Sequence, residues 1–212
     1  MENPIYDLYL ELSGRQKITD EVWKLWCKKN KTLEEKEEII IGSILTQGTN
    51  WRNVEKALYN LRKKKICSIN KINVFGRNRI SELEKFLQPC GFYRQKAKYL
   101  YMLCQFLSCN YQKLEDFFKE DLPLVRQKIL SQKGIGPETA DTILLYAGNK
   151  LTFVIDEYTR RLVKRNKISQ NLDYHFLQKL FQRSLPKEVS IYQKFHVLIV
   201  ENEKLVKKEI KI

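Results

Sequence analysis

The chain has 212 residues, 43% of them hydrophobic and 30% charged, which excludes a disordered chain and allows one compact unit or two small lobes. Its 39 Lys and Arg residues outnumber 25 Asp and Glu residues, so the formal charge is +14 and a polyanionic partner is favoured, although a lysine-rich solvated surface is the common alternative. The sequence has neither an apolar run of membrane-spanning length nor the pattern of a signal peptide, so we expect an intracellular protein without a membrane partner.

Cysteine usage points away from disulfides and from a metal site. The five cysteines are odd in number and scattered along the chain: Cys27, Cys67, Cys90, Cys104 and Cys109. These spacings suggest neither a disulfide framework nor a close set of metal ligands. No metal is therefore expected.

Two amphipathic helices are predicted at the N-terminal end. The first has apolar residues at helical spacing, namely Ile5, Leu8, Tyr9 and Leu12. Thr19-Asp20 can cap the second helix, in which Trp23 and Trp26 lie three residues apart and therefore share a face. Simple packing of two large apolar rings explains at least one of these tryptophans.

The middle of the chain continues as helices. Residues 33–45 begin with acids and become apolar, which predicts a core helix ending before the stretch TQGTNW at 46–51. Residues 53–65 predict a basic helix, and residues 66–76 are expected to be irregular. The turn QPCGF at 88–92 then interrupts two further helices.

A glycine hairpin follows between two predicted helices. The first helix carries apolar residues at helical spacing: Leu122, Val125, Ile129 and Leu130. The stretch KGIG at 133–136 must end it, and Pro137 suits the first position of the second helix. Bare glycine backbone and the N–H groups of a helix start can hold a phosphate without reading a base. An ordinary helix–helix turn explains this motif, taken alone, equally well.

Asp156 stands at a boundary between core and helix. The apolar run 153–155 should be buried, so Asp156 emerges just before a predicted helix at 157–164. A plain N-cap is the simplest interpretation. Flanked by Arg160 and Arg161 at a helix start, the carboxylate should also stay ionised, and an ionised carboxylate stabilises the positive transition state of N-glycosidic bond cleavage.

The blocks KGIGPETADTILLYA and FVIDEYTRR together resemble the helix-hairpin-helix (HhH-GPD) DNA glycosylase superfamily, the endonuclease III group. Because no cysteine follows Asp156, the chain is closest in type to the cluster-free 3-methyladenine glycosylases of that superfamily. The resemblance implies an all-α fold of two helical lobes with DNA in a cleft. One lobe, a six-helix barrel, spans 28–150 with the helix-hairpin-helix at about 122–148; the other combines 1–27 with 151–212. The absence of hairpin-type strand alternation in the sequence agrees independently.

By position, the resemblance makes Asp156 the catalytic residue. Bifunctional relatives carry a Schiff-base lysine two residues after the second hairpin glycine, and Glu138 stands there. A carboxylate cannot form an imine, which implies a monofunctional enzyme. Lys133, with Gly134 and Gly136, is expected to contact phosphate, although its amine is the nearest alternative for lyase chemistry.

The resemblance also assigns residues to the duplex and to the base. Gln47 would fill the hole left by an extruded nucleotide, and Phe92 after Gly91 would wedge into the opposite strand. Each has a structural alternative, a satisfied turn for Gln47 and core packing for Phe92. Arg160 is also assigned to DNA binding. The base pocket would be lined by Trp51, Trp23, Trp26 and Glu138, and core packing explains Trp51 equally well.

Cofactors are expected to be absent. Many relatives end with four cysteines that bind an iron–sulfur cluster, whereas no cysteine follows Asp156 here. Some cluster-free relatives carry a modified lysine at that end, for which Lys204 is the nearest candidate, and a monovalent cation at the hairpin is compatible with the family. We interpret His196, on an apolar helix face, as structural, and His175 has no identifiable partner.

The sequence thus predicts a monofunctional DNA glycosylase of base excision repair that acts as a monomer, cytoplasmic or nucleoid-associated, on double-stranded DNA containing a damaged base. Alkylated purines such as 3-methyladenine are the leading substrates, because they already carry charge and leave easily. The alternatives are an endonuclease III-like glycosylase with lyase activity, a mismatch thymine or uracil glycosylase, and a non-enzymatic helix-hairpin-helix DNA-binding protein.

Overall fold

The computed structural model describes residues 3–209, and every regular element in that range is helical, which confirms the predicted all-α class. No helix in the same range is long and apolar enough to cross a membrane. The chain divides into two compact units: unit 1 comprises Met1–Asn30 and Asn149–Ile212, and unit 2 comprises Lys31–Gly148. The sequence placed these boundaries at residues 28 and 150.

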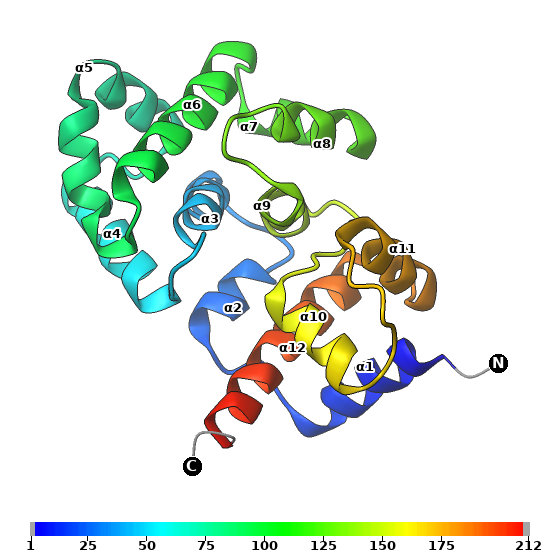
Figure 1. The fold of residues 1–212 in the computed structure, drawn as a ribbon. Coiled ribbons are helices and arrows are strands. Elements are labelled where there is room, and N and C mark those ends of the chain that lie inside the picture. The colour runs from blue at the N-terminus through cyan, green and yellow to red at the C-terminus, as the bar shows by residue number, and fades with distance from the viewer. Residues whose placement is uncertain (1–2, 210–212) are drawn as a thin grey trace. The chain divides into compact units, whose positions relative to one another are not determined.

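Unit 2 is built around α3 (Leu33–Leu45), a helix whose second half is apolar. Thr32 and Glu35 start it with a reciprocal capping box, as an N-cap threonine followed by an N3 glutamate should. Five side chains of α3 are completely buried: Ile39, Ile40, Ile41, Ile44 and Leu45. A helical segment that is apolar on all sides must be surrounded by other elements. In Figure 1 its neighbours within unit 2 are drawn from cyan to yellow-green.

The remaining elements of unit 2 enclose α3. They are α4 (Trp51–Lys63), α5 (Ile69–Leu87), the 3₁₀ turn η1 (Gln88–Cys90), α6 (Tyr93–Asn110), α7 (Leu114–Lys119), α8 (Leu122–Leu130), α9 (Pro137–Thr142) and the π-helical turn η2 (Ile143–Ala147). Helices α5 and α6 pack against each other along their length (Figure 1). All five residues of η2 are buried, so the helix that follows the glycine hairpin is anchored in the core of this unit.

The expectation of irregular structure at 66–76 is wrong, because α5 begins at Ile69. Its N-cap, Ser68, makes no side-chain capping bond; instead Glu37 Oε1 accepts a hydrogen bond of 3.1 Å from the Ile69 N–H. Gly76 lets α5 approach α6, since a Cβ there would lie 2.5 Å from the Tyr101 ring. A cap from 32 residues earlier in the chain leaves no local signal.

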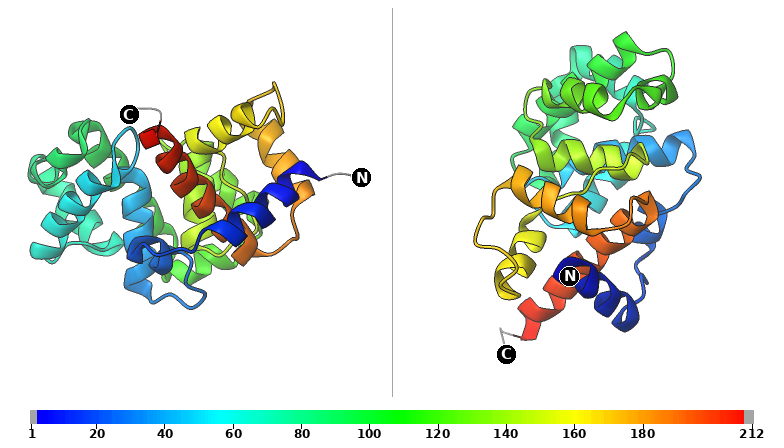
Figure 2. Two further views of the ribbon diagram at one scale, coloured as in Figure 1. Left: turned by 90° about the horizontal axis from the view of Figure 1, so that it is seen from below. Right: turned by 90° about the vertical axis from the view of Figure 1, so that its right-hand side faces the viewer.

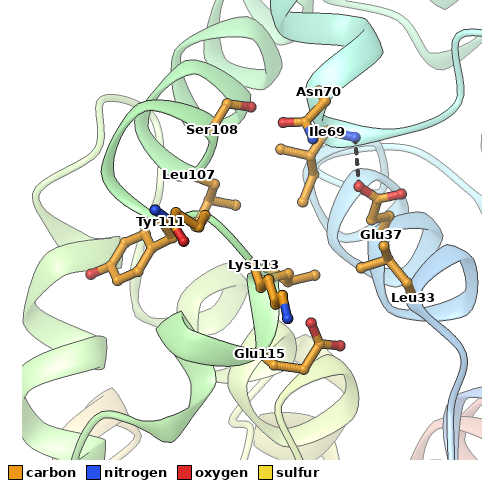
Figure 3. Close-up of a pocket in the computed structure, with 11 residues that line it drawn as sticks. Leu33, Glu37, Ile69, Asn70, Leu107, Ser108, Tyr111, Lys113 and Glu115 are labelled. Carbon is orange, nitrogen blue, oxygen red and sulfur yellow. Dashed lines mark hydrogen bonds between the residues drawn. The ribbon is translucent and has the colours of Figure 1, made fainter.

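Beside this cap, unit 2 contains a cavity of about 260 Å³. Figure 3 shows the Glu37 carboxylate on its wall, bonded to Ile69, with Lys113 and Glu115 on the side of α7. Burial raises the pKa of Glu37, and the hydrogen bond from Ile69 acts against that rise. The Glu37 carboxylate thus lies on the cavity wall because it caps α5.

Unit 1 combines both ends of the chain. It contains α1 (Pro4–Arg15), α2 (Glu21–Trp26), α10 (Glu157–Arg165), α11 (Tyr174–Ser184) and α12 (Val189–Glu209). Helices α1 and α10 pack on α12, the long red helix of Figures 1 and 2. Stacked rings form its core: Phe153 lies 4.8 Å from Phe181, which lies 5.9 Å from Phe195.

Truncating the end of α3 should measure how strongly unit 2 depends on it. We expect Leu45→Ala, at a side chain with no exposed surface, to lower the free energy of unfolding by about 2–5 kcal/mol, because a cavity replaces buried methyl groups. Leu33→Ala, in the same helix but 44% exposed, should change it by about 0.5 kcal/mol or less. Urea unfolding of both variants checks this, and equal losses would contradict it.

Candidate functional site

The two hairpin glycines have different conformations. Gly134 has a φ of +84°, in the left-handed region, whereas Gly136 has a φ of −90° and caps α9. A Cβ at Gly134 would lie 2.1 Å from the Tyr99 ring, while a Cβ at Gly136 would meet nothing within 4 Å. Gly134 is therefore required by conformation and packing, and Gly136 leaves an open stretch of backbone at the start of α9.

A buried ion pair braces the helices on either side of the hairpin. Arg126 of α8 donates from Nε and Nη2 to the two carboxylate oxygens of Asp141 in α9, at 2.8 and 2.9 Å. The Asp141 side chain is completely buried. A bidentate pair of this kind fixes direction as well as distance, so it sets the geometry of the turn between α8 and α9.

Gln47 holds the loop after α3 against the hairpin. Its Nε2 donates to the Gly134 carbonyl and to Thr139 Oγ1, each at 3.0 Å. The side chain is half-buried, so the structural alternative considered for it, a satisfied turn, is what the structure shows. Its role inside a duplex stays a prediction.

Phe92 is on the surface, so the alternative that it packs into the core is wrong. Its side chain is 75% exposed and its φ is +44°, directly after Gly91 at +63°. A left-handed conformation costs a residue other than glycine about 1–2 kcal/mol. Unit 2 therefore presents an apolar ring to solvent on a strained turn, as a wedge requires.

The other residues of unit 2 that the sequence assigned to DNA or to the base are exposed or half-buried. Lys133 is exposed just before Gly134, and Glu138 is exposed in the first turn of α9. Trp51 is the half-buried first residue of α4. Their assigned contacts with phosphate and base remain predictions.

In unit 1, the two oxygens of Asp156 have different surroundings. Oδ1 caps α10, accepting from the N–H and the hydroxyl of Thr159 at 2.7 and 2.8 Å. Oδ2 lies 3.4 Å from Nε2 of His196, a buried residue of α12. The Asp156 side chain is 13% exposed, so the carboxylate sits at the edge of the core, where the sequence placed it.

The pKa of Asp156 lies below its ordinary value. Burial raises the pKa, but the hydrogen bond and charge of His196 and the two donors of Thr159 lower it further than burial raises it. The sequence attributed an ionised state to the helix start and to Arg160 and Arg161; the Thr159 N–H at the helix start is among the causes, whereas the two arginines are not. Arg160 Nε donates to the Leu172 carbonyl at 3.3 Å, and Arg161 pairs with Glu157 at 3.1 Å.

A second polar group in unit 1 centres on Glu201. Glu201 Oε1 accepts from Trp23 Nε1 at 2.9 Å and from Lys204 Nζ at 2.7 Å. The Trp23 ring meets His196 edge-on at 6.3 Å and Trp26 at 5.5 Å, and Trp26 is buried. Trp26 thus packs as a core residue. Trp23 contacts both Glu201, which binds Lys204, and His196, which lies beside Asp156.

His196 is the residue whose place the sequence reasoning missed. It was interpreted as a structural histidine, and the structure puts it beside Asp156. Forty residues of chain separate the two, so no spacing rule could pair them. Thr159 could have been found, because an aspartate followed three residues later by threonine fits the start of a capped helix.

The hairpin offers a matched pair of substitutions. Gly134→Ala should destabilise the protein by about 1–3 kcal/mol, because it adds both a left-handed alanine and a clash with Tyr99. Gly136→Ala meets neither obstacle and should leave stability within about 0.5 kcal/mol. Thermal unfolding distinguishes the two, and an equally stable Gly134→Ala variant would refute this account of the turn.

Comparisons with known proteins agree with this geometry. The HhH-GPD superfamily of base excision DNA repair proteins matches residues 41–187. A proposed DNA repair glycosylase of Methanocaldococcus jannaschii is 39% identical over 172 residues, which make up 80% of this chain and 77% of that protein.

Solved structures give the same result. The H. pylori 3-methyladenine DNA glycosylase MagIII, bound to 1,N6-ethenoadenine, has a TM-score of 0.79 and 30% identity over 95% of this chain and 97% of that one. A non-covalent endonuclease III–DNA complex shares the fold, with a TM-score of 0.69 and 18% identity over 92% of this chain and 85% of that one. The chain therefore belongs to the HhH-GPD superfamily of base excision DNA repair proteins and is a DNA glycosylase.

Proposed function

We propose that this protein is a monofunctional glycosylase that hydrolyses the N-glycosidic bond of an alkylated purine, such as 3-methyladenine, after the nucleotide has left the duplex. The observation that carries the proposal is the Asp156 carboxylate. Oδ1 is fixed by Thr159, and Oδ2 lies 3.4 Å from His196 Nε2; these two residues lower the pKa of the carboxyl. A fixed anion at the edge of the core suits a cationic transition state.

The reaction would proceed by departure of the base before attack of water. The bond between C1′ and the purine nitrogen breaks with its electron pair moving to the base, which leaves positive charge on the sugar. Asp156 stabilises that charge, a water attacks C1′, and the water's proton passes to the carboxylate. An alkylated purine is already cationic and leaves as a neutral molecule, so no acid needs to protonate it.

Hydrolysis is favoured over strand cleavage by the residue at position 138. A lyase step needs an amine that attacks C1′ and forms an imine, and Glu138 offers a carboxylate in the first turn of α9. Lys133 is exposed and lies before the glycine turn, a place that suits contact with a phosphate. We propose that the abasic product is released intact.

Alkylated purines are favoured by the aromatic residues and by one relative. The Trp23 ring, beside His196, and the half-buried Trp51 offer π-faces that attract an electron-poor cationic base. MagIII of H. pylori, 30% identical over nearly the whole chain, is a 3-methyladenine glycosylase bound to 1,N6-ethenoadenine. Both observations support a modified purine as substrate.

DNA would be held by backbone and by shape. In unit 2, the exposed Gly136 backbone and the Lys133 side chain suit a phosphate, and the exposed Phe92 suits a wedge between base pairs. We propose that this reaction uses no iron–sulfur cluster, because every cysteine of the chain precedes Asp156. Lys204 modification is a separate proposal that mass spectrometry of the intact protein would test.

A panel of duplexes, each with a single lesion, tests the substrate and the reaction type. The lesions should include 3-methyladenine, 1,N6-ethenoadenine, 8-oxoguanine, uracil and a thymine mismatch. We expect release of alkylated purines, no strand cleavage until alkali is added, and no trapped protein–DNA adduct with borohydride. Borohydride trapping or alkali-independent cleavage would instead indicate a lyase, and preferred release of thymine or uracil would indicate a mismatch enzyme.

Replacing the carboxylate should abolish excision without unfolding α10. Asp156→Asn keeps an N-cap side chain but removes the charge, so single-turnover excision should fall at least about 100-fold while DNA affinity is kept. Asp173→Asn is the matched control, since Asp173 caps α11 in the same way but is exposed. Normal excision by Asp156→Asn would show that another residue is catalytic.

The pH dependence of excision should reveal His196. The lowered pKa of Asp156 keeps the carboxylate ionised, and excision should be lost as pH falls through that pKa. His196→Gln removes the ring whose hydrogen bond and charge lower the pKa of Asp156, so that pKa rises and the acid limb of the rate profile should move to higher pH. His175 is an exposed residue of α11, so His175→Gln should leave the profile unchanged. An unmoved acid limb in His196→Gln would contradict the assigned role.

A further inference from the structure

A lysine is buried in unit 2 with its ammonium group on two backbone carbonyls. The side chain of Lys96, in α6, is 2% exposed. Its Nζ donates to the Leu45 carbonyl at 2.9 Å and to the Cys90 carbonyl at 2.8 Å. Burying an ammonium is costly, and an apolar side chain of similar size would often serve stability as well. The position of the two carbonyls explains why a lysine is used.

Each of the two carbonyls belongs to the last residue of an element, just before a segment that is predicted to enter the duplex. Leu45 is the last residue of α3 and directly precedes the loop that contains Gln47. Cys90 ends η1 and directly precedes Gly91 and Phe92. One ammonium therefore joins the points from which both segments leave the core of unit 2.

Further bonds tie the same two segments together. The Lys96 N–H donates to the Phe92 carbonyl at 3.0 Å, so the ammonium is carried one turn beyond the exposed ring. Cys90 Sγ lies 3.4 Å from the Asn53 carbonyl, and Asn53 Nδ2 donates to Thr49 Oγ1 at 3.1 Å. The loop after α3 and the turn before α6 thus form one connected assembly.

The hairpin is attached to this assembly by two side chains. Gln47 bonds to the Gly134 carbonyl, and the Tyr99 ring of α6 covers Gly134. Tyr99 follows Lys96 by three residues and lies on the next turn of the same helix. A change in the Lys96 contacts would therefore reach the loop, the turn and the hairpin together.

We propose that Lys96 is a positioning residue for opening the duplex: its ammonium group fixes the spacing between the Gln47 loop and the Phe92 turn so that both enter the DNA together. The proposal rests on the proposed function. Because the Lys96 ammonium is buried on two backbone carbonyls, we expect it to act on duplex opening and to leave the chemical step at Asp156 unchanged.

Lys96→Met tests this, because methionine keeps the aliphatic stem and removes the ammonium. The probe is a duplex with a tetrahydrofuran abasic analogue facing 2-aminopurine, whose fluorescence rises when the 2-aminopurine is unstacked from its neighbouring bases. We expect the rise seen with the unsubstituted protein to fall about tenfold with Lys96→Met, as it should with Phe92→Ser. Lys96→Arg, which keeps a cation with N–H donors, should recover part of the signal.

Excision separates positioning from general damage to the fold. For the best lesion of the panel, Lys96→Met should excise about tenfold more slowly from paired duplex but within about twofold of normal from an unpaired bulge, where opening is not needed. Leu100→Ala is the matched control, a fully buried truncation one turn further along α6. It should change both substrates by the same factor.

Two results would overturn the proposal: an unchanged fluorescence rise with Lys96→Met, or equal losses on duplex and bulge. A wild-type protein that never raises the fluorescence would overturn it as well. Failure of the proposed function is separable, because a protein that opens the abasic probe through Lys96 but releases no lesion of the panel would refute hydrolysis and leave the positioning role standing.

Discussion

Half-burial of one carboxylate is the constraint on which unit 1 depends. Taking Asp156 to the edge of the core raises its pKa, and a protonated acid could not stabilise a cationic sugar. Two groups from different helices reverse that effect. Thr159 of α10 donates twice to Oδ1, and His196 of α12 faces Oδ2. Phe153, three residues before Asp156, lies 6.0 Å from Phe195 and 6.4 Å from His196, so ring packing ties the segment that carries the acid to α12.

In unit 1, packing supports a polar group. In unit 2, polar side chains in the interior instead hold segments that are exposed to solvent. Arg126 pairs with Asp141 behind the hairpin, Gln47 bonds to its carbonyl, and Lys96 bonds to the ends of α3 and η1. Each of these groups satisfies backbone or side-chain partners that would otherwise be buried without a hydrogen bond. The segments they hold carry the exposed features of the unit, the Gly136 backbone and the Phe92 ring.

The three glycine positions show why a motif has to be resolved residue by residue. Gly134 and Gly91 have positive φ values, whereas Gly136 has an ordinary backbone and is open to solvent. The two hairpin glycines therefore have different roles. Gly134 adopts a left-handed conformation, and Gly136 leaves the backbone accessible. Of the two hairpin glycines, Gly136 is the one whose backbone a phosphate could approach without displacing a ring.

Local patterns in the sequence determined much of this protein. Helix periodicity gave α3 its observed bounds, and the hairpin, the buried run 153–155 and the capping role of Asp156 were all legible from neighbouring residues. The family resemblance rested on the same short blocks, because phosphate binding and capping need residues at fixed short spacings. Tertiary structure alone decided the long-range pairs: Glu37 on the start of α5, His196 on Asp156, and Lys96 between two helix ends. In each pair, a side chain contacts a backbone group or a charge that is many residues away in the chain. The spacing of residues in the sequence does not predict such contacts, because they form only when the core brings the helices together.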